Sequence, residues 1–186
     1  MTYVVSVVSA KGGSGKTTLS SILLATAPEA VSAVDADPSE GLGRWLALAG
    51  SEIPYVAAPD AEAVQAAVEA VETPLLVMDT PPVFEAAEAV QAAIAASDAV
   101  LTPCIPSPAD VERLATVRAL VPPEKHRVVL SQQRDWTRAG KEIRGALGEA
   151  GYAVLDAAIP LREALRTAWG SALPTESGID IWKEIR

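Results

Sequence analysis

The chain has 186 residues and a formal net charge of −9, and hydrophobic residues make up 49% of it. A chain of this length usually builds a single core, so we expect one domain over residues 1–186. The acidic balance excludes a protein that coats nucleic acid or an anionic membrane by bulk attraction, although a local basic patch could still bind either.

The cysteine content and the hydropathy pattern indicate where the protein works. Cys104 is the single cysteine, which excludes an intrachain disulfide and a metal site built from several thiolates, as a reducing compartment predicts. No stretch approaches the ~18 apolar residues that cross a bilayer, and the first residues lack the pattern of a secretory signal. We therefore expect a cytoplasmic protein.

Short β-branched runs alternate with longer segments rich in Ala, Leu and Glu. This alternation is typical of βαβ units, and it predicts an α/β fold of three layers, in which helices flank a mainly parallel twisted sheet. We expect strands at 3–9, 31–34, 54–57, 75–78, 99–103, 127–130 and 153–155. We expect helices at 16–27, 41–49, 61–71, 84–96, 108–120, 138–150, 162–169 and 179–185.

The first expected strand runs into a glycine-rich turn and then a helix. The turn reads Lys11-Gly12-Gly13-Ser14-Gly15-Lys16-Thr17-Thr18. Its glycines let the backbone curl with the N–H groups inward, and the helix adds its positive end, so the turn can cradle a polyphosphate. Lys16 would lie near the outer phosphates, and Thr17 would place its hydroxyl on Mg²⁺. The alternative is a glycine-rich turn with an incidental lysine.

Ala10 stands where a general phosphate loop has its first glycine, and Lys11 follows it directly. The run K-G-G-S-G-K-T-T resembles the deviant phosphate loop of the ParA/MinD family of P-loop ATPases, and the resemblance extends over most of the chain. It implies a P-loop NTPase fold, ATP or ADP and Mg²⁺ as cofactors, and nucleotide binding by the loop from Lys11 to Thr18. It also implies that Lys16 acts in catalysis and that Lys11 reaches the phosphates of a partner subunit. A cation supplied on assembly would stabilise the charge that develops in phosphoryl transfer.

Acidic residues follow the second and fourth expected strands. Asp35 and Asp37 lie in the order D-A-D-P, which is similar to the family's segment after its second strand. The match implies that Asp35 lies near the Mg²⁺ shell and that Asp37 positions the attacking water; a helix cap is the alternative for such a carboxylate. Asp79 ends an apolar strand before a proline pair and resembles the family's Walker B acid, which implies a place in the metal's water shell. An ordinary proline turn after a strand is the alternative there.

The segment from Pro106 to Asp110 follows the fifth expected strand. It resembles the loop that lies by the nucleotide and the dimer face in the smaller plasmid-partition ATPases, so we expect Pro106 and Asp110 to contribute to nucleotide binding. The family's adenine-side asparagine is not evident after the sixth strand, where the chain reads Ser131-Gln132-Gln133. A preference for adenine therefore rests on the resemblance alone.

Basic residues recur at helical spacing in the second half of the chain. One set is Arg134, Arg138, Lys141 and Arg144, and a second is Arg162 with Arg166. On a continuous helix the first set would form a cationic stripe, which could contact DNA or could be a solvated face.

The last eight residues, 179–186, carry Ile179, Trp182 and Ile185 on one face if they are helical. A MinD-like membrane anchor would look similar. We favour a terminal helix packed on the domain, because the segment is short and carries two acids.

The lead hypothesis is a plasmid or chromosome partition ATPase. ATP and Mg²⁺ would promote a homodimer, the dimer would bind DNA without sequence preference, and a centromere-binding ParB-like protein would stimulate slow hydrolysis. Such a protein would associate with the nucleoid. The runner-up is a MinD-like membrane-associated positioning ATPase. An electron-transfer ATPase similar to the nitrogenase iron protein would need paired cysteines, and a biosynthetic enzyme on this fold stays open.

Overall fold

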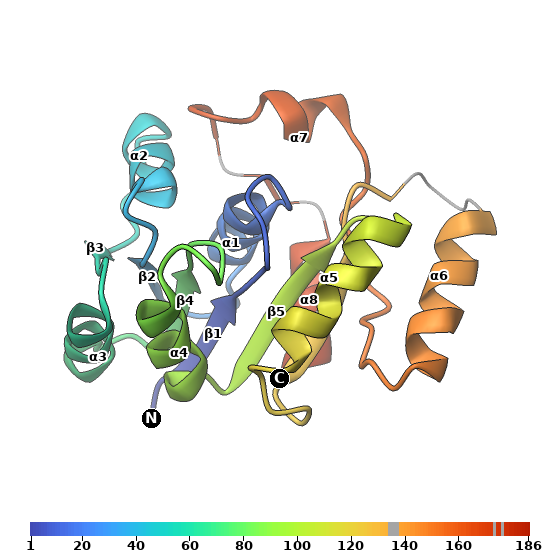
Figure 1. The fold of residues 1–186 in the computed structure, drawn as a ribbon. Coiled ribbons are helices and arrows are strands. Elements are labelled where there is room, and N and C mark those ends of the chain that lie inside the picture. The colour runs from blue at the N-terminus through green and yellow to red at the C-terminus, as the bar shows by residue number, and fades with distance from the viewer. Residues whose placement is uncertain (134–137, 173, 176) are drawn as a thin grey trace.

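A six-stranded sheet forms the centre of the computed structural model (Figure 1), which describes residues 1–133, 138–172, 174–175 and 177–186. The strands lie in the order β3-β2-β4-β1-β5-β6, and all neighbours are parallel. The predicted parallel sheet is confirmed. The strands are β1 (Tyr3–Val7), β2 (Val31–Asp35), β3 (Tyr55–Ala57), β4 (Leu75–Asp79), β5 (Ala99–Cys104) and β6 (His126–Leu130).

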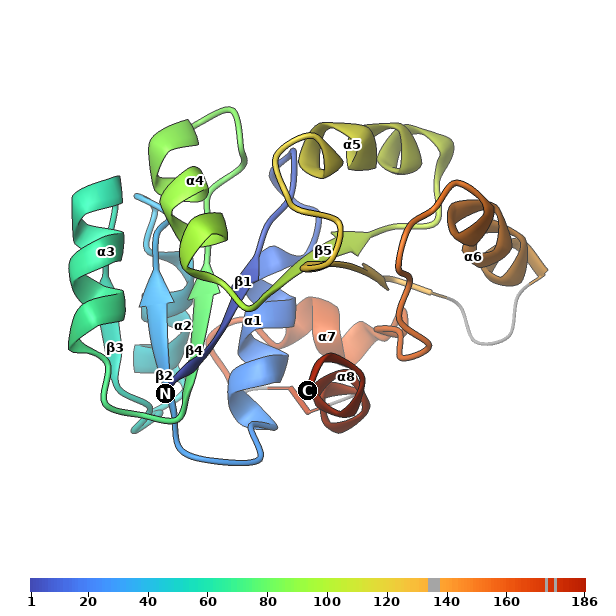
Figure 2. The same ribbon diagram turned by 90° about the horizontal axis from the view of Figure 1, so that it is seen from below.

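Helices cover both faces of the sheet and complete three layers (Figure 2). Helices α1, α2 and α8 pack on one face, α3, α4 and α5 pack on the other, and α6 packs beside α5. The expected P-loop NTPase architecture is therefore present. The helices are α1 (Lys16–Ala25), α2 (Gly41–Leu48), α3 (Ala61–Ala70), α4 (Ala87–Ala96), α5 (Pro108–Arg118), α6 (Arg138–Glu149), α7 (Glu163–Thr167) and α8 (Gly178–Ile185).

Both sheet faces are apolar because both are covered. All five residues of β4 are buried, and so are Val4, Val5 and Val7 of β1. Continuous apolar runs of this kind are typical of parallel strands between two helical layers. Helix α3 is capped by Asp60, whose carboxylate accepts from the N–H of Ala63 at 2.8 Å.

One expected strand is not formed, and one expected helix begins later than predicted. The segment 153–155 is not a strand, because Val154 forms only one isolated bridge with Val128 of β6. The guanidinium of Arg144 binds the carbonyl oxygens of Leu155 and Asp156, so these acceptors are not available to extend a ladder. Helix α4 begins at Ala87 rather than at residue 84, and the preceding residues form a loop after β4.

The C-terminal helix α8 packs against α1, as predicted. Ile181 and Trp182 are buried, and the indole N–H of Trp182 donates to the carbonyl oxygen of Leu23 at 3.0 Å. Its apolar face is therefore occupied within the domain. Across the described residues, no helix is long and apolar enough to span a bilayer.

Candidate functional site

The glycine-rich turn joins the central strand β1 to α1, at the carboxyl edge of the sheet. Gly13 and Gly15 have φ values of 72° and 93°, in the left-handed region that favours glycine. A Cβ at Gly12, Gly13 or Gly15 would meet no atom within 4 Å. The glycines therefore provide backbone conformation and open space beside the loop, which is the arrangement that lets backbone N–H groups approach a polyphosphate.

Lys16 is the first residue of α1, and only 7% of its surface is exposed. Its ammonium donates to the carbonyl oxygen of Lys11 at 3.3 Å. Burial lowers the pKa of Lys16, and the nearby carboxylates of Asp79, Asp37 and Glu85 oppose that shift. The ammonium is thus held inside the loop among acids, where the phosphates of a nucleotide would supply further negative charge.

Asp79, at the end of β4, is fully buried beside the start of α1. The hydroxyl of Thr17 donates to its Oδ2 at 2.7 Å, and the hydroxyl of Ser20 donates to its Oδ1 at 2.9 Å. Burial raises the pKa of Asp79 to about 7, while both hydrogen bonds oppose that shift. The structure thus brings together Thr17 and Asp79, which were each expected at Mg²⁺, and their roles toward the metal stay predictions. Ser20, which was not predicted from the sequence, lies one helical turn after Thr17 on the same face.

The donor set around Thr17 suits Mg²⁺. This cation prefers oxygen ligands and is commonly held by one or two protein groups together with phosphate oxygens and waters. The structure brings together one hydroxyl and one carboxylate, from Thr17 and Asp79. No cluster of three or more His, Cys, Asp or Glu side chains suited to a metal occurs in the described part of the chain. The site therefore fits a nucleotide-bridged metal rather than a cage of protein ligands.

Asp35 caps a helix in this structure. One of its carboxylate oxygens accepts from the backbone N–H groups of Leu42 and Gly43 at 2.8 and 3.1 Å, at the start of α2. Burial raises its pKa, and these backbone hydrogen bonds oppose the shift. Its role near Mg²⁺ stays a prediction. Asp37 is less buried and accepts from the N–H of Ser39 at 2.9 Å. Its charge acts on the ammonium of Lys16.

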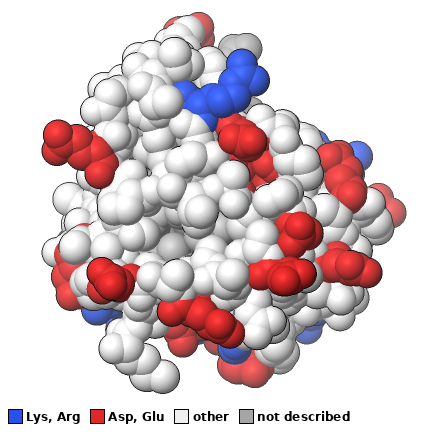
Figure 3. All heavy atoms as spheres, turned by 90° about the vertical axis from the view of Figure 1, so that its left-hand side faces the viewer, with Lys and Arg blue, Asp and Glu red and all other residues white. Residues whose placement is uncertain are grey.

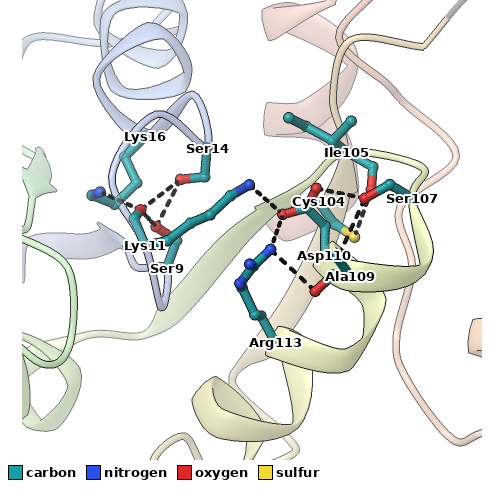
Figure 4. Close-up of polar contacts among 10 residues, drawn as sticks. All are labelled: Ser9, Lys11, Ser14, Lys16, Cys104, Ile105, Ser107, Ala109, Asp110 and Arg113. Atoms are coloured by element: carbon teal, nitrogen blue, oxygen red, sulfur yellow. Dashed lines mark hydrogen bonds and ion pairs between the residues drawn. The ribbon is translucent and has the colours of Figure 1, made fainter.

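Lys11 and Lys16 extend in opposite directions from the loop (Figure 4). The ammonium of Lys11 pairs with Asp110 of α5 at 2.7 Å, and the two side chains are 35% and 12% exposed. Asp110 also accepts from Ser107 at 2.7 Å and pairs with Arg113 at 3.3 Å. Lys11 is therefore held outside the loop of its own chain.

The electrostatics of Asp110 match this arrangement. Burial alone would raise its pKa, but the hydrogen bonds from Lys11 and Ser107 outweigh burial and hold the pKa below its usual range. Its carboxylate is accordingly ionised and bound to Lys11.

A cavity of about 320 Å³ lies beside the phosphate loop. Pro106 and Asp110, which were expected to bind nucleotide, are not among the described residues that line it. Its far wall comes from the end of β6 and the segment that leads into α7, and the hydroxyl of Ser131 is buried there without a hydrogen-bond partner among the described residues. The lining is residues 13–18 together with Ser131, Gln132, Ile159, Pro160, Leu161, Arg162 and Leu165.

This far wall of the cavity was not predicted from the sequence. The position of Ser131 in the sequence could have indicated it. Open parallel sheets bind ligands at the carboxyl ends of their strands, and Ser131 directly follows β6. The contribution of residues 159–165 depends on backbone pairing of Gln133 with Pro160, which no motif indicates.

Residues 5–175 match the family model described as the CobQ/CobB/MinD/ParA nucleotide binding domain. The chain belongs to this family of ParA/MinD-type ATPases. This assignment agrees with the parallel sheet, the deviant phosphate loop and the Thr17–Asp79 pair.

Individual relatives of this ParA/MinD-type ATPase share its fold. It is 33% identical over 173 residues to maintenance of carboxysome distribution protein A of Gloeobacter kilaueensis, a match that covers 89% of this chain and 77% of that protein. The MinD cell division protein of Aquifex aeolicus superposes with a TM-score of 0.72 at 17% identity, covering 98% and 96% of the two chains. An aspartate-to-alanine variant of Cyanothece McdA in complex with ATP has a TM-score of 0.71 at 16% identity, covering 99% and 96%.

The structure of this ParA/MinD-type domain describes only part of the expected cationic stripe. Arg134 lies outside the described residues, and the side chain of Arg138 is likewise not described. Arg144 is half-buried and binds the carbonyl oxygens of Leu155 and Asp156. It therefore stabilises the domain, while Lys141 of the same helix is exposed.

Proposed function

We propose that this chain is an ATP-driven positioning switch, in which Mg·ATP joins two copies and hydrolysis separates them. The observation that carries the proposal is the pair of lysines on one loop. Lys16 is buried inside the loop, and Lys11 extends out of it toward Asp110. A cation on the outer side of the loop is placed to contact phosphates bound by a second copy of the chain, rather than phosphates bound in its own loop.

The remaining residues have separate tasks in this mechanism. The loop amides and Lys16 bind and orient the phosphates, and Thr17 with Asp79 would hold Mg²⁺, which neutralises charge on the phosphate oxygens when bound. Asp37, whose charge acts on the ammonium of Lys16, orients the attacking water. Lys11 of the partner copy stabilises charge on the transferred phosphoryl group, so hydrolysis requires assembly.

The cargo belongs to the partition-like class. The relative named for carboxysome distribution supports positioning of a protein compartment as well as of a plasmid or chromosome. We propose that the ATP-bound dimer binds DNA without sequence preference and so associates with the nucleoid. A cargo-bound activator, a ParB-like protein in the case of DNA cargo, then stimulates hydrolysis.

Gel filtration with ADP and with a non-hydrolysable ATP analogue tests the switch. We expect monomer with ADP and dimer with the analogue and Mg²⁺. Lys16→Ala should abolish nucleotide binding in calorimetry, whereas Lys11→Ala should retain monomer binding and lose the dimer. Arg113→Ala is the matched control, because it removes another cation that contacts Asp110 and leaves the loop intact. A dimer that forms equally well with ADP, or in Lys11→Ala, refutes the proposal.

Co-sedimentation separates DNA from membrane as the surface on which the switch works. The buried face of α8 argues against this helix as a membrane anchor. We expect analogue-dependent sedimentation with DNA and none with anionic vesicles. Binding to vesicles alone would favour the MinD-like alternative.

A further inference from the structure

The sheet edge at β3 is exposed. Among the described strands β3 pairs with β2 alone, and its residues Tyr55, Val56 and Ala57 are all exposed. The carbonyl of Pro54 and the N–H of Ala58 both bond to β2, each at 2.8 Å. Because alternate residues of a parallel strand bond to the same neighbour, the peptide groups of Tyr55 and Ala57 point away from β2. An added strand could bond to them.

A groove of about 370 Å³ lies beside this edge, between β3 and α3. Its floor includes Val34 and Leu76 from the core of the sheet. The wall on α3 includes Ala67 and Ala70, whose methyl groups leave the space unfilled, and Val56 on the rim is 46% exposed. A strand paired with β3 would direct alternate side chains into this groove.

The surroundings of the groove are negatively charged. Residues 45–112 contain no Lys, Arg or His. Glu72 lines the groove, and Glu69 lies on the last turn of α3. That turn has no basic residue to offset the partial negative charge of the carbonyl groups at the end of the helix. Figure 3 shows this side of the molecule, where acidic side chains are spread widely and basic ones are few.

We propose that the β3–α3 groove binds an extended basic segment of a partner protein, which pairs with β3 as an additional strand and places small apolar side chains against Ala67 and Val56. Lysine or arginine side chains of that segment would lie near Glu69 and Glu72. Adding a strand to a sheet edge is a general mode of peptide recognition. The same charge repels nucleic acid, and it disfavours a second copy of this chain, whose β3 edge carries the same acids.

The groove lies away from the phosphate loop. Its lining includes Ser32 at the start of β2 and Thr73 just before β4, whereas the phosphate loop follows the end of β1. The proposed docking therefore stands independently of the ATP-driven switch, and a variant that blocks the groove should bind nucleotide normally.

Fluorescence anisotropy with a short labelled peptide of alternating lysine and valine tests the docking. Two variants block the groove in different ways. Ala67→Leu fills it, and Ala57→Pro removes an outward N–H that makes no bond to β2. We expect each to weaken binding by about tenfold or more. Ala66→Leu is the matched control, because Ala66 is the adjacent residue of α3 and does not line the groove.

Three further measurements decide the interpretation. Hydrogen exchange at Tyr55 and Ala57 should slow when the peptide binds, and a glutamate–valine peptide or duplex DNA should not slow it. Thermal unfolding and nucleotide binding should be unchanged in both blocking variants, which shows that they are folded. The proposal is overturned if the peptide does not bind, if the blocking variants bind as tightly as Ala66→Leu, or if DNA or a second copy occupies the edge instead.

Discussion

The ion pair between Lys11 and Asp110 competes with the proposed role of Lys11 in the dimer. Asp110→Asn keeps the shape of the side chain and its contact with Ser107, but it removes the charge that holds Lys11. Lys11 would then be free to reach the partner's nucleotide. We expect the variant to dimerise more readily with a non-hydrolysable ATP analogue.

The expected change in the dissociation constant of the dimer follows from the exposure of the Lys11–Asp110 ion pair. Its side chains are 35% and 12% exposed, and partly exposed ion pairs contribute about 0.2–1 kcal/mol. Each dimer breaks two such pairs, so the dissociation constant should fall by about 2- to 30-fold, from about 0.4–2 kcal/mol in total.

Sedimentation equilibrium with the analogue measures that constant. Glu112→Gln is the matched control, since it removes an exposed carboxylate from the same helix without releasing Lys11. In a Lys11→Ala background, Asp110→Asn should have no effect. If Asp110→Asn weakens the dimer, Asp110 acts within the assembled state, and the competition between the two contacts is refuted.

The remaining predictions concern turnover and stability. Asp37→Ala should bind ATP normally and leave a long-lived dimer with little phosphate release; normal turnover would remove Asp37 from the catalytic residues. Burial, with the charges of Arg118 and Arg127, lowers the pKa of His126 to about 4. As the pH falls, His126 therefore takes up its proton in the unfolded chain before it does so in the folded protein. Its contribution to the free energy of unfolding is fully present above about pH 6.5, and about 3 kcal/mol of it is lost as the pH drops to about 4. Urea unfolding should show that loss in the wild type and not in His126→Gln. Trp182→Ala should lower the free energy of unfolding by about 3–5 kcal/mol, and an effect no larger than that of the exposed Lys183→Ala would show that α8 contributes little.

The sequence was sufficient for the features that depend on neighbours along the chain. The parallel sheet followed from apolar runs alternating with helical segments, and the phosphate loop followed from glycines at positions with positive φ, such as Gly13 and Gly15. The cap at Asp60 is equally local, because its acceptor and the N–H of Ala63 are three residues apart. Each of these features depends on residues close together in the sequence, so residue patterns and local preferences are enough to predict it.

Tertiary structure alone decided the contacts between distant segments. Lys11 meets Asp110 across 99 positions because β1 and β5 are adjacent in the sheet. The wall of the nucleotide cavity at residues 159–165 exists because that segment pairs beside the end of β6. The β3 groove is open because α3 presents alanines toward the sheet edge. These features depend on strand order and on side-chain volume at packed surfaces, and neither is encoded in the spacing of residues along one segment.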